Sequence, residues 1–159
     1  MFSASIETLV NGLDKNARLM GLDVGEKTIG LALSDALRSI ASPLEVIERG
    51  KFSKDAERLR TLCEKHKVGG FVVGYPINMN GTEGPRCQST RQFCRNLHEK
   101  LGLPMLLQDE RMSTIAVGRV MDDAELSRTR KSEIVDKLAA SYILQSALDR
   151  YQRNSNHES

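Results

Sequence analysis

The stretch "RLMGLDVGEKTIGLALSD" constrains the fold of this 159-residue chain most strongly, because two apolar runs flank a glycine-containing turn. Residues 18–24 and 28–35 predict two buried strands joined by a turn around Gly25 and Lys27. Asp23 lies inside the first run, where burying a lone ionised carboxylate would be costly. The sequence must therefore supply a partner for this side chain.

Three further apolar runs predict strands. Residues 39–49 form the first, in which Pro43 requires a break or an edge position in the sheet. The runs "VGGFVVGY" and "LPMLLQDER" predict two more buried strands. The residues between and after them predict helices over 53–66 (capped by Ser53), 85–101, 113–121 (capped by Ser113) and 133–151, with the basic segment "LSRTRKS" as a loop before the last.

This order predicts an α/β fold with a mixed central sheet flanked by helices. The first three strands form an antiparallel meander. Two parallel strands follow, because a helix between buried strands implies a right-handed crossover. The length suits a single domain over residues 1–159, with a leader helix at 1–16 and a frayed tail at 152–159.

Composition narrows the class of protein. No apolar run reaches the roughly 20 residues of a membrane span, and Glu7 and Asp14 in the leader argue against a signal or transit peptide. The three cysteines show no CxxC spacing, which favours free thiols in a cytoplasmic protein, with Cys87 and Cys94 on the buried face of one helix. A net charge of +2 permits an anionic partner without requiring one.

Carboxylates gather at the predicted carboxyl ends of the parallel strands, where open α/β sheets bind ligands. Asp23 ends the first of these strands, and Asp109 and Glu110 end the last. Asp136 shares the apolar face of the last helix with Ala140. Like charges at low dielectric repel, and a divalent cation such as Mg²⁺ or Mn²⁺ relieves that repulsion. Two such ions about 3.5–4 Å apart would support phosphodiester hydrolysis.

Simpler interpretations of these acids remain open. Asp23 would suit a turn-capping role before Gly25, and Asp109 and Glu110 would suit an ion-paired strand end beside Arg111. Asp136 would interact favourably with the dipole near its helix start. A set of basic residues would contact a phosphate backbone beside a carboxylate site: Lys27, Arg86, Arg111, Arg128, Arg130 and Lys131.

The chain also resembles the YqgF family, also called RuvX, of bacterial pre-16S rRNA nucleases related to the Holliday junction resolvase RuvC. The motifs that carry the resemblance are "GLDVGEKTIGLALSD", "VVGYPINMNGTEGPRCQ", "LLQDERMST" and "VDKLAASYILQSAL". The resemblance implies an RNase H-like fold, with Asp23, Asp136 and one acid of the Asp109–Glu110 pair as catalytic metal ligands. Glu110 is favoured over Asp109, although the strand register is needed to decide.

The resemblance further implies an endonuclease that processes the 5′ end of small-subunit ribosomal RNA precursor. The sequence leaves open whether the chain is a monomer or a homodimer. Two positions depart from the family pattern: Asn80 replaces an aspartate found in many relatives, and Ala139 stands where RuvC-type resolvases place a further metal ligand. The alternatives are a resolvase-like DNase acting on branched DNA and a non-catalytic RNA- or protein-binding module in ribosome assembly. An ATPase of the actin and hexokinase type would need two such domains.

Overall fold

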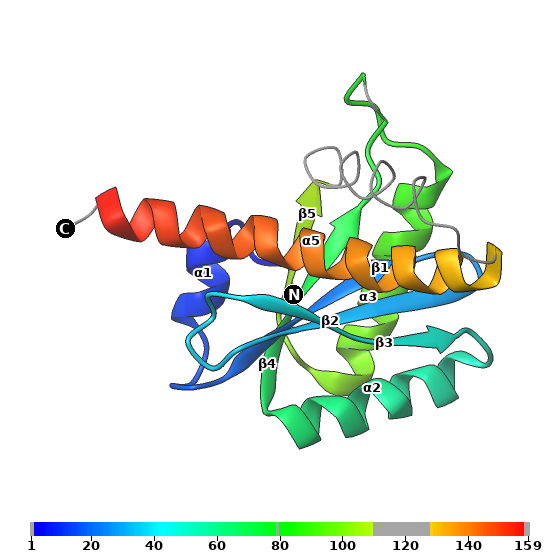
Figure 1. Ribbon diagram of the computed structural model, residues 1–159, viewed down its shortest axis with the longest axis horizontal. Coiled ribbons are helices and arrows are strands. Elements are labelled where there is room, and N and C mark those ends of the chain that lie inside the picture. Colours follow the sequence, from blue (N-terminus) through cyan, green and yellow to red (C-terminus); the bar gives the residue numbers. More distant parts are fainter. Residues whose placement is uncertain (1, 79, 110–127, 158–159) are drawn as a thin grey trace.

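The computed structural model describes residues 2–78, 80–109 and 128–157, with side chains in the last range from 138 to 153. A five-stranded sheet of order β3-β2-β1-β4-β5 forms its centre. Figure 1 shows helix α5 lying across one face of this sheet. The strands are β1 (Arg18–Val24), β2 (Thr28–Ser34), β3 (Ala41–Glu48), β4 (Val68–Tyr75) and β5 (Met105–Asp109), and the helices are α1 (Ile6–Asn11), α2 (Phe52–His66), α3 (Pro85–Leu101) and α5 (Arg128–His157).

The strand directions confirm the predicted mixed sheet. Strand β2 pairs antiparallel with both β1 and β3. Strand β4 pairs parallel with β1 and β5, because helices α2 and α3 return the chain to the same edge of the sheet. β1 is therefore the central strand, and its carboxyl end, which carries Asp23, lies at the middle of one sheet edge.

Pro43 occupies the position that its chemistry requires. Strand β3 is at the edge of the sheet, where a residue without a backbone N–H can be tolerated. Pro43 lies opposite Ala32, and the β2–β3 register shifts between Leu31 and Ala32. The predicted edge position is confirmed, and β3 continues through Pro43 with a register irregularity rather than a break.

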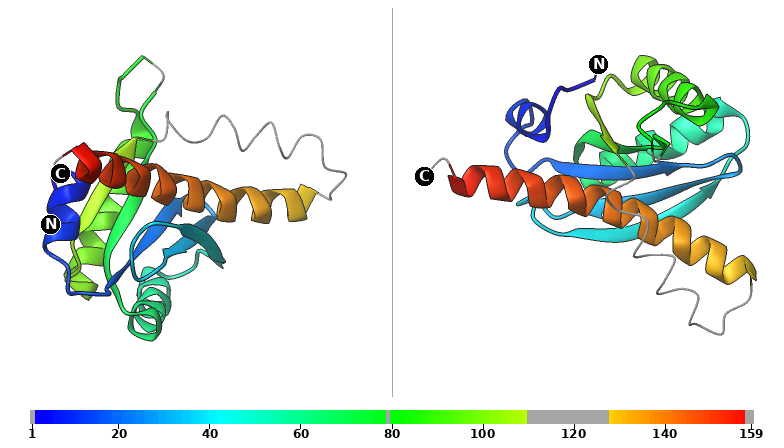
Figure 2. Two further views of the ribbon diagram at one scale, coloured as in Figure 1. Left: turned by 60° about the vertical axis from the view of Figure 1, so that its left-hand side comes forward. Right: turned by 90° about the horizontal axis from the view of Figure 1, so that it is seen from above.

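Two hydrophobic layers cover the sheet, one on each face. Helices α1 and α5 pack on one face, burying residues such as Leu9 and Ile143. Helices α2 and α3 pack on the other face, burying residues such as Leu59 and Leu97. Figure 2 shows α5 separated from α2 and α3 by the sheet. Cys87 and Cys94 are both fully buried on α3, as predicted. Because β1 and β4 are covered by helices on both faces, their sequences are nearly continuous apolar runs.

Several predicted boundaries are wrong. Helix α2 begins at Phe52 after Lys51, so Ser53 is inside the helix rather than its cap. The backbone N–H of Gly50 donates to the carboxylate of Asp55 at 3.3 Å and stabilises this earlier start. The predicted leader helix is confined to α1.

The last helix is longer than predicted at both ends. Arg128, Arg130 and Lys131 lie in α5 rather than in a loop, and the helix continues to His157 through most of the tail that was expected to fray. Arginine and lysine are good helix formers, and residues 128–157 contain no glycine or proline to end the helix. The predicted helix 113–121 lies outside the described residues. Within the described residues, no helix combines the length and apolar character needed to cross a membrane.

Gly21 allows α5 to approach the sheet closely. A Cβ atom at this position would lie 2.7 Å from the carbonyl oxygen of Ala140 and 2.8 Å from the Cβ of Leu144. Both distances are shorter than van der Waals contact, so a larger residue would push the helix away from β1. The close crossing therefore depends on glycine at this position.

We expect Gly21→Ala to lower the free energy of unfolding by about 1–3 kcal/mol, the usual cost of overpacking a core. Gly12→Ala is the matched control, because its Cβ would meet no atom closer than 3.7 Å and its φ of −87° suits alanine. Urea denaturation of the two variants checks this. Equal stability of the two variants would contradict a tight crossing at Gly21.

Candidate functional site

Asp23 lies on the face of the sheet that α5 covers. Side chains alternate along a strand, so Asp23 shares a face with Gly21, over which α5 crosses. Asp23 is half-buried and pairs with Gly30 on β2. On the other side, Gly74 follows the last paired residue of β4, Val73. The neighbouring strands thus have glycines next to the Asp23 position.

The packing of β5 decides on which face of the sheet Asp109 lies. Leu106 packs in the core under α5, whereas Met105 and Leu107 pack in the core under α2 and α3. Alternation places Asp109 with Met105 and Leu107, on the face opposite to Asp23. Glu110 lies outside the described residues. The structure therefore does not bring Asp109 together with Asp23.

Gln108 is a polar residue that the sequence analysis missed. It pairs with Gly74, shares the face of Leu106, and is 2% exposed. Its side-chain nitrogen Nε2 is buried without a hydrogen-bond partner among the described residues. Buried donors are nearly always paired in folded proteins. A polar residue at the end of the apolar run "PMLLQ" was the sequence signal that could have identified Gln108. In the structure its unpaired donor lies on β5, two strands from Asp23.

The backbone of α5 places Asp136 at the level of Asp23. The Gln145 side chain accepts from the N–H of Ala41 at 2.8 Å, and so lies near the amino end of β1. Helix α5 therefore runs from the carboxyl end of β1 toward its amino end. Asp136 precedes Ala140 by one helical turn, about 6 Å, and Asp23 follows Gly21 by two strand residues, about 7 Å. Both steps lead in the same direction from the crossing point.

The described side chains do not by themselves form a metal centre. Among the side chains that the structure describes, no group of three or more His, Cys, Asp or Glu residues is arranged to hold a metal ion. Glu110 and the side chain of Asp136 are outside the described set. The grouping of Asp23, Glu110 and Asp136 therefore stays a prediction, supported by the strand register and the path of α5.

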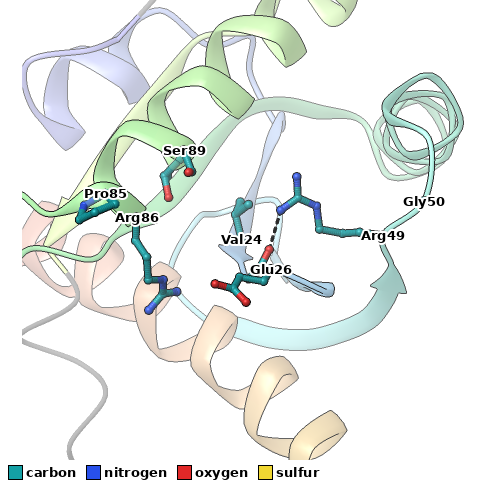
Figure 3. A pocket seen from close by; sticks show the side chains of 9 residues that line it. Val24, Glu26, Arg49, Gly50, Pro85, Arg86 and Ser89 are labelled. Carbon is teal, nitrogen blue, oxygen red and sulfur yellow. Dashed lines mark hydrogen bonds between the residues drawn. The ribbon is translucent and has the colours of Figure 1, made fainter.

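A pocket of about 500 Å³ lies at the same end of β1, on the opposite face of the sheet. It separates the ends of β1 and β3 from the first turns of α3 (Figure 3). The Arg49 guanidinium donates to the carbonyl oxygen of Gly25 at 2.6 Å and lies 5.3 Å from the ring centre of Phe93. The lining residues are Val24, Gly25, Glu26, Arg49, Gly50, Pro85, Arg86, Ser89 and Thr90.

The candidate phosphate-contacting residues are distributed differently. Arg86 lines this pocket, and Lys27 is exposed in the β1–β2 turn. The backbone of Arg128, Arg130 and Lys131 forms the beginning of α5, and Arg111 lies outside the described residues. Arg49 was missed by sequence reasoning. Since β3 runs in the same direction as β1, its carboxyl end, followed by Arg49, reaches the same sheet edge.

The two departures from the family pattern have local structural roles. The Asn80 side-chain oxygen accepts from the Thr82 hydroxyl at 2.6 Å and from the Thr82 backbone N–H at 3.1 Å, which stabilises the turn of the loop after β4. Ala139 is buried on α5. Asn80 is therefore used within its own loop, and Ala139 supplies no metal-binding atom.

Comparisons with known proteins agree with this fold. The chain matches the family described as "RuvX: Holliday junction resolvase" over residues 17–150. A protein of Paramagnetospirillum magneticum is 52% identical over 141 residues, covering 89% of this chain and 91% of its own. A protein of Methylocella silvestris is 54% identical over 136 residues, covering 86% and 84%. Both carry the name "Putative pre-16S rRNA nuclease".

Among solved structures, RuvC of Thermus thermophilus in complex with a Holliday junction substrate superimposes with a TM-score of 0.53 and 12% sequence identity. The match covers 85% of this chain and 96% of RuvC. At this identity the likeness concerns the fold, and it confirms the predicted RNase H-like α/β architecture. With the family match covering most of its length and relatives at about half identity, the chain belongs to the RuvX family.

Proposed function

We propose that this chain is a metal-dependent endonuclease that hydrolyses phosphodiester bonds in nucleic acid. The observation that carries the proposal is the half-buried Asp23 at the carboxyl end of the central strand, at the level of Asp136 on α5. In a RuvX family member, these positions and Glu110 form the expected ligand set. The carboxyl ends of parallel strands are the general ligand-binding edge of such sheets.

The residues present fit a divalent cation such as Mg²⁺ or Mn²⁺. Carboxylate oxygens are the hard ligands that these ions prefer, and Asp23 has glycines beside it on both neighbouring strands. The unpaired Nε2 donor of Gln108 suits a hydrogen bond to a ligating carboxylate, the usual outer-shell role. Bound divalent ions supply activation of water and stabilisation of charge on the leaving oxygen.

We infer that the substrate is the precursor of small-subunit ribosomal RNA, cut at its 5′ end in the cytoplasm. The names of the curated relatives support this assignment. Branched DNA is the second candidate, because the family description and the structurally similar RuvC complex both concern Holliday junctions. The basic residues Lys27, Arg86 and Arg111, with those at the start of α5, would hold the phosphate backbone.

One preparation of the protein can distinguish the two substrates. It is incubated with precursor ribosomal RNA and with a four-way DNA junction, each with Mg²⁺ and each with EDTA. Cleavage of the RNA alone, dependent on Mg²⁺, is the expected result. Cleavage of the junction alone would replace the substrate assignment, and absence of cleavage on both would contradict the nuclease proposal.

Asp23→Asn is expected to reduce Mg²⁺-dependent cleavage by at least about 100-fold, since altering even an outer-shell group costs 10–100-fold. Substrate binding should persist, because phosphate contacts from basic residues supply most of the affinity. Asp109→Asn is the matched control and should cleave at a rate close to that of the unmodified chain, because Asp109 faces the opposite side of the sheet. Cleavage assays under single-turnover conditions measure both. Near-normal cleavage by Asp23→Asn would remove it from the ligand set.

Asp136→Asn separates a metal-binding role from a helix-stabilising role. Removing one of several neighbouring carboxylates should relieve repulsion, so the variant should melt higher than the unmodified chain in EDTA. It should also gain less stability from Mg²⁺, because a ligand stabilises in proportion to its affinity for the folded state, and it should be inactive. Thermal melts with EDTA and with Mg²⁺ measure this. A lower melting temperature with preserved cleavage would instead support the helix-dipole role.

Gln108→Leu tests the unpaired buried donor. Replacing an unsatisfied amide with an apolar side chain should raise the free energy of unfolding in EDTA by about 1 kcal/mol. Cleavage should fall by about 10–100-fold if the amide supports a metal ligand. Gln92→Leu is the control, since Gln92 is exposed on α3 and donates to Asn96. Urea denaturation and cleavage rates of the two variants are compared. Unchanged cleavage by Gln108→Leu would mean that Gln108 has only a structural role.

A further inference from the structure

We propose that the pocket between the β1–β2 turn and the start of α3 binds a phosphate group of the nucleic-acid backbone, next to the phosphate that is cut. The identity of the ligand rests on the proposed nuclease function. The pocket itself is built from described residues on the face of the sheet opposite to Asp23. It would hold the substrate without taking part in the chemistry.

The charges in the pocket favour an anion. Arg49 and Arg86 both line it, and neither makes a salt bridge among the described residues. Figure 3 shows the Arg49 and Arg86 side chains with Glu26 between them. The exposed Glu26 carboxylate offsets one of these charges, which leaves an excess of one positive charge. Guanidinium groups bind phosphate oxygens through paired hydrogen bonds.

The position of Arg49 is fixed before any ligand binds. Its hydrogen bond to the Gly25 carbonyl oxygen and its stacking over Phe93 hold the guanidinium at the pocket wall. A positively charged group that is already ordered loses little conformational entropy when it binds a ligand. The pocket is thus partly organised for an anion.

The start of α3 adds backbone and hydroxyl donors. Gly84 caps the helix without a side-chain hydrogen bond, and Pro85 follows it. The N–H of Cys87 donates to the Gly84 carbonyl oxygen, whereas the N–H of Arg86 has no hydrogen-bond acceptor among the described residues.

Thr90 provides an independent observation. It lines the pocket and is 3% exposed, yet its hydroxyl makes no hydrogen bond to the described residues. The Thr90 hydroxyl does not belong to the buried polar atoms that lack a partner among the described residues, so it is reached from the pocket and is free to donate to a bound group. A phosphate oxygen would satisfy it. This makes the site more than a helix start with positive charges nearby.

The position of the pocket suggests how the substrate lies. Val24 lines it, and the preceding residue, Asp23, faces the other side of the sheet. A nucleic-acid strand that crosses the β1–β2 turn would therefore place one phosphate at Asp23 and a neighbouring phosphate in the pocket. Gly25 lies at this turn and lines the pocket, so no side chain projects there. The volume of about 500 Å³ is within the range of sites for nucleotide-sized ligands.

Inorganic phosphate tests the pocket alone. In EDTA, phosphate should produce saturable amide chemical-shift changes at Arg86, Cys87 and Thr90, observed by ¹⁵N nuclear magnetic resonance. Arg86→Gln should weaken this binding by about tenfold, as expected for a charged hydrogen bond, and Thr90→Val should weaken it without loss of folding. Arg95→Gln is the control, because it makes the same charge change on an exposed residue of the same helix. Absent shifts, or shifts unaffected by Arg86→Gln, would overturn the proposal.

A second measurement distinguishes a backbone phosphate from a free one. RNA binding is followed by fluorescence anisotropy over a range of KCl concentrations, in the inactive Asp23→Asn chain. Arg86→Gln should reduce the log–log salt slope by about 0.7, the value for one lost single-strand phosphate contact, and Arg95→Gln should leave it unchanged. Phosphate binding with an unaltered RNA slope would overturn the assignment to a backbone phosphate. If the nuclease proposal alone is wrong, the chain will not cleave either substrate but will still bind phosphate in the pocket.

Discussion

The close crossing of α5 over β1 at Gly21 is the contact on which the arrangement of the candidate site depends. The absence of a side chain at Gly21 lets the Ala140 backbone approach the central strand, where a Cβ atom would lie 2.7 Å from its carbonyl oxygen. From that crossing point, one helical turn leads to Asp136 and two strand residues lead to Asp23. The packing of one glycine thus sets the spacing between two acids that are more than a hundred residues apart in sequence.

The end of β1 separates two different environments. On the α5 face, Asp23 pairs with Gly30 of β2, and the buried Gln108 lies on the same face two strands away, on β5. On the other face, Arg49 and Arg86 line a pocket with an excess of positive charge. Strand alternation places Asp23 and the pocket arginines on opposite faces of the sheet, so that a nucleic-acid strand passing the end of β1 would meet both. The sheet therefore separates the proposed site of cleavage on one face from the proposed phosphate-binding pocket on the other.

Much of the fold was predictable from local patterns. The bounds of β1, β4 and α3 agree with the runs read from the sequence, since buried apolar strands and a proline at a helix start leave strong signals. The beginning of α5 was not predictable in this way. Its basic residues were interpreted as a loop, although they are good helix formers. The cap of α2 was misplaced because Asp55, rather than Ser53, bonds the preceding backbone.

The sequence by itself determined the strands, most of the helices, the mixed sheet and the candidate acids, because hydrophobic periodicity and residue chemistry are local properties. Only the tertiary structure decided that Asp109 faces away from Asp23, since that depends on how β5 pairs with β4 and which face of the sheet each helix covers. It also revealed the buried Nε2 atom of Gln108, which has no hydrogen-bond partner among the described residues, and the contribution of Arg49 to the pocket. These features arise from contacts between distant segments, and no local pattern encodes which segments will meet.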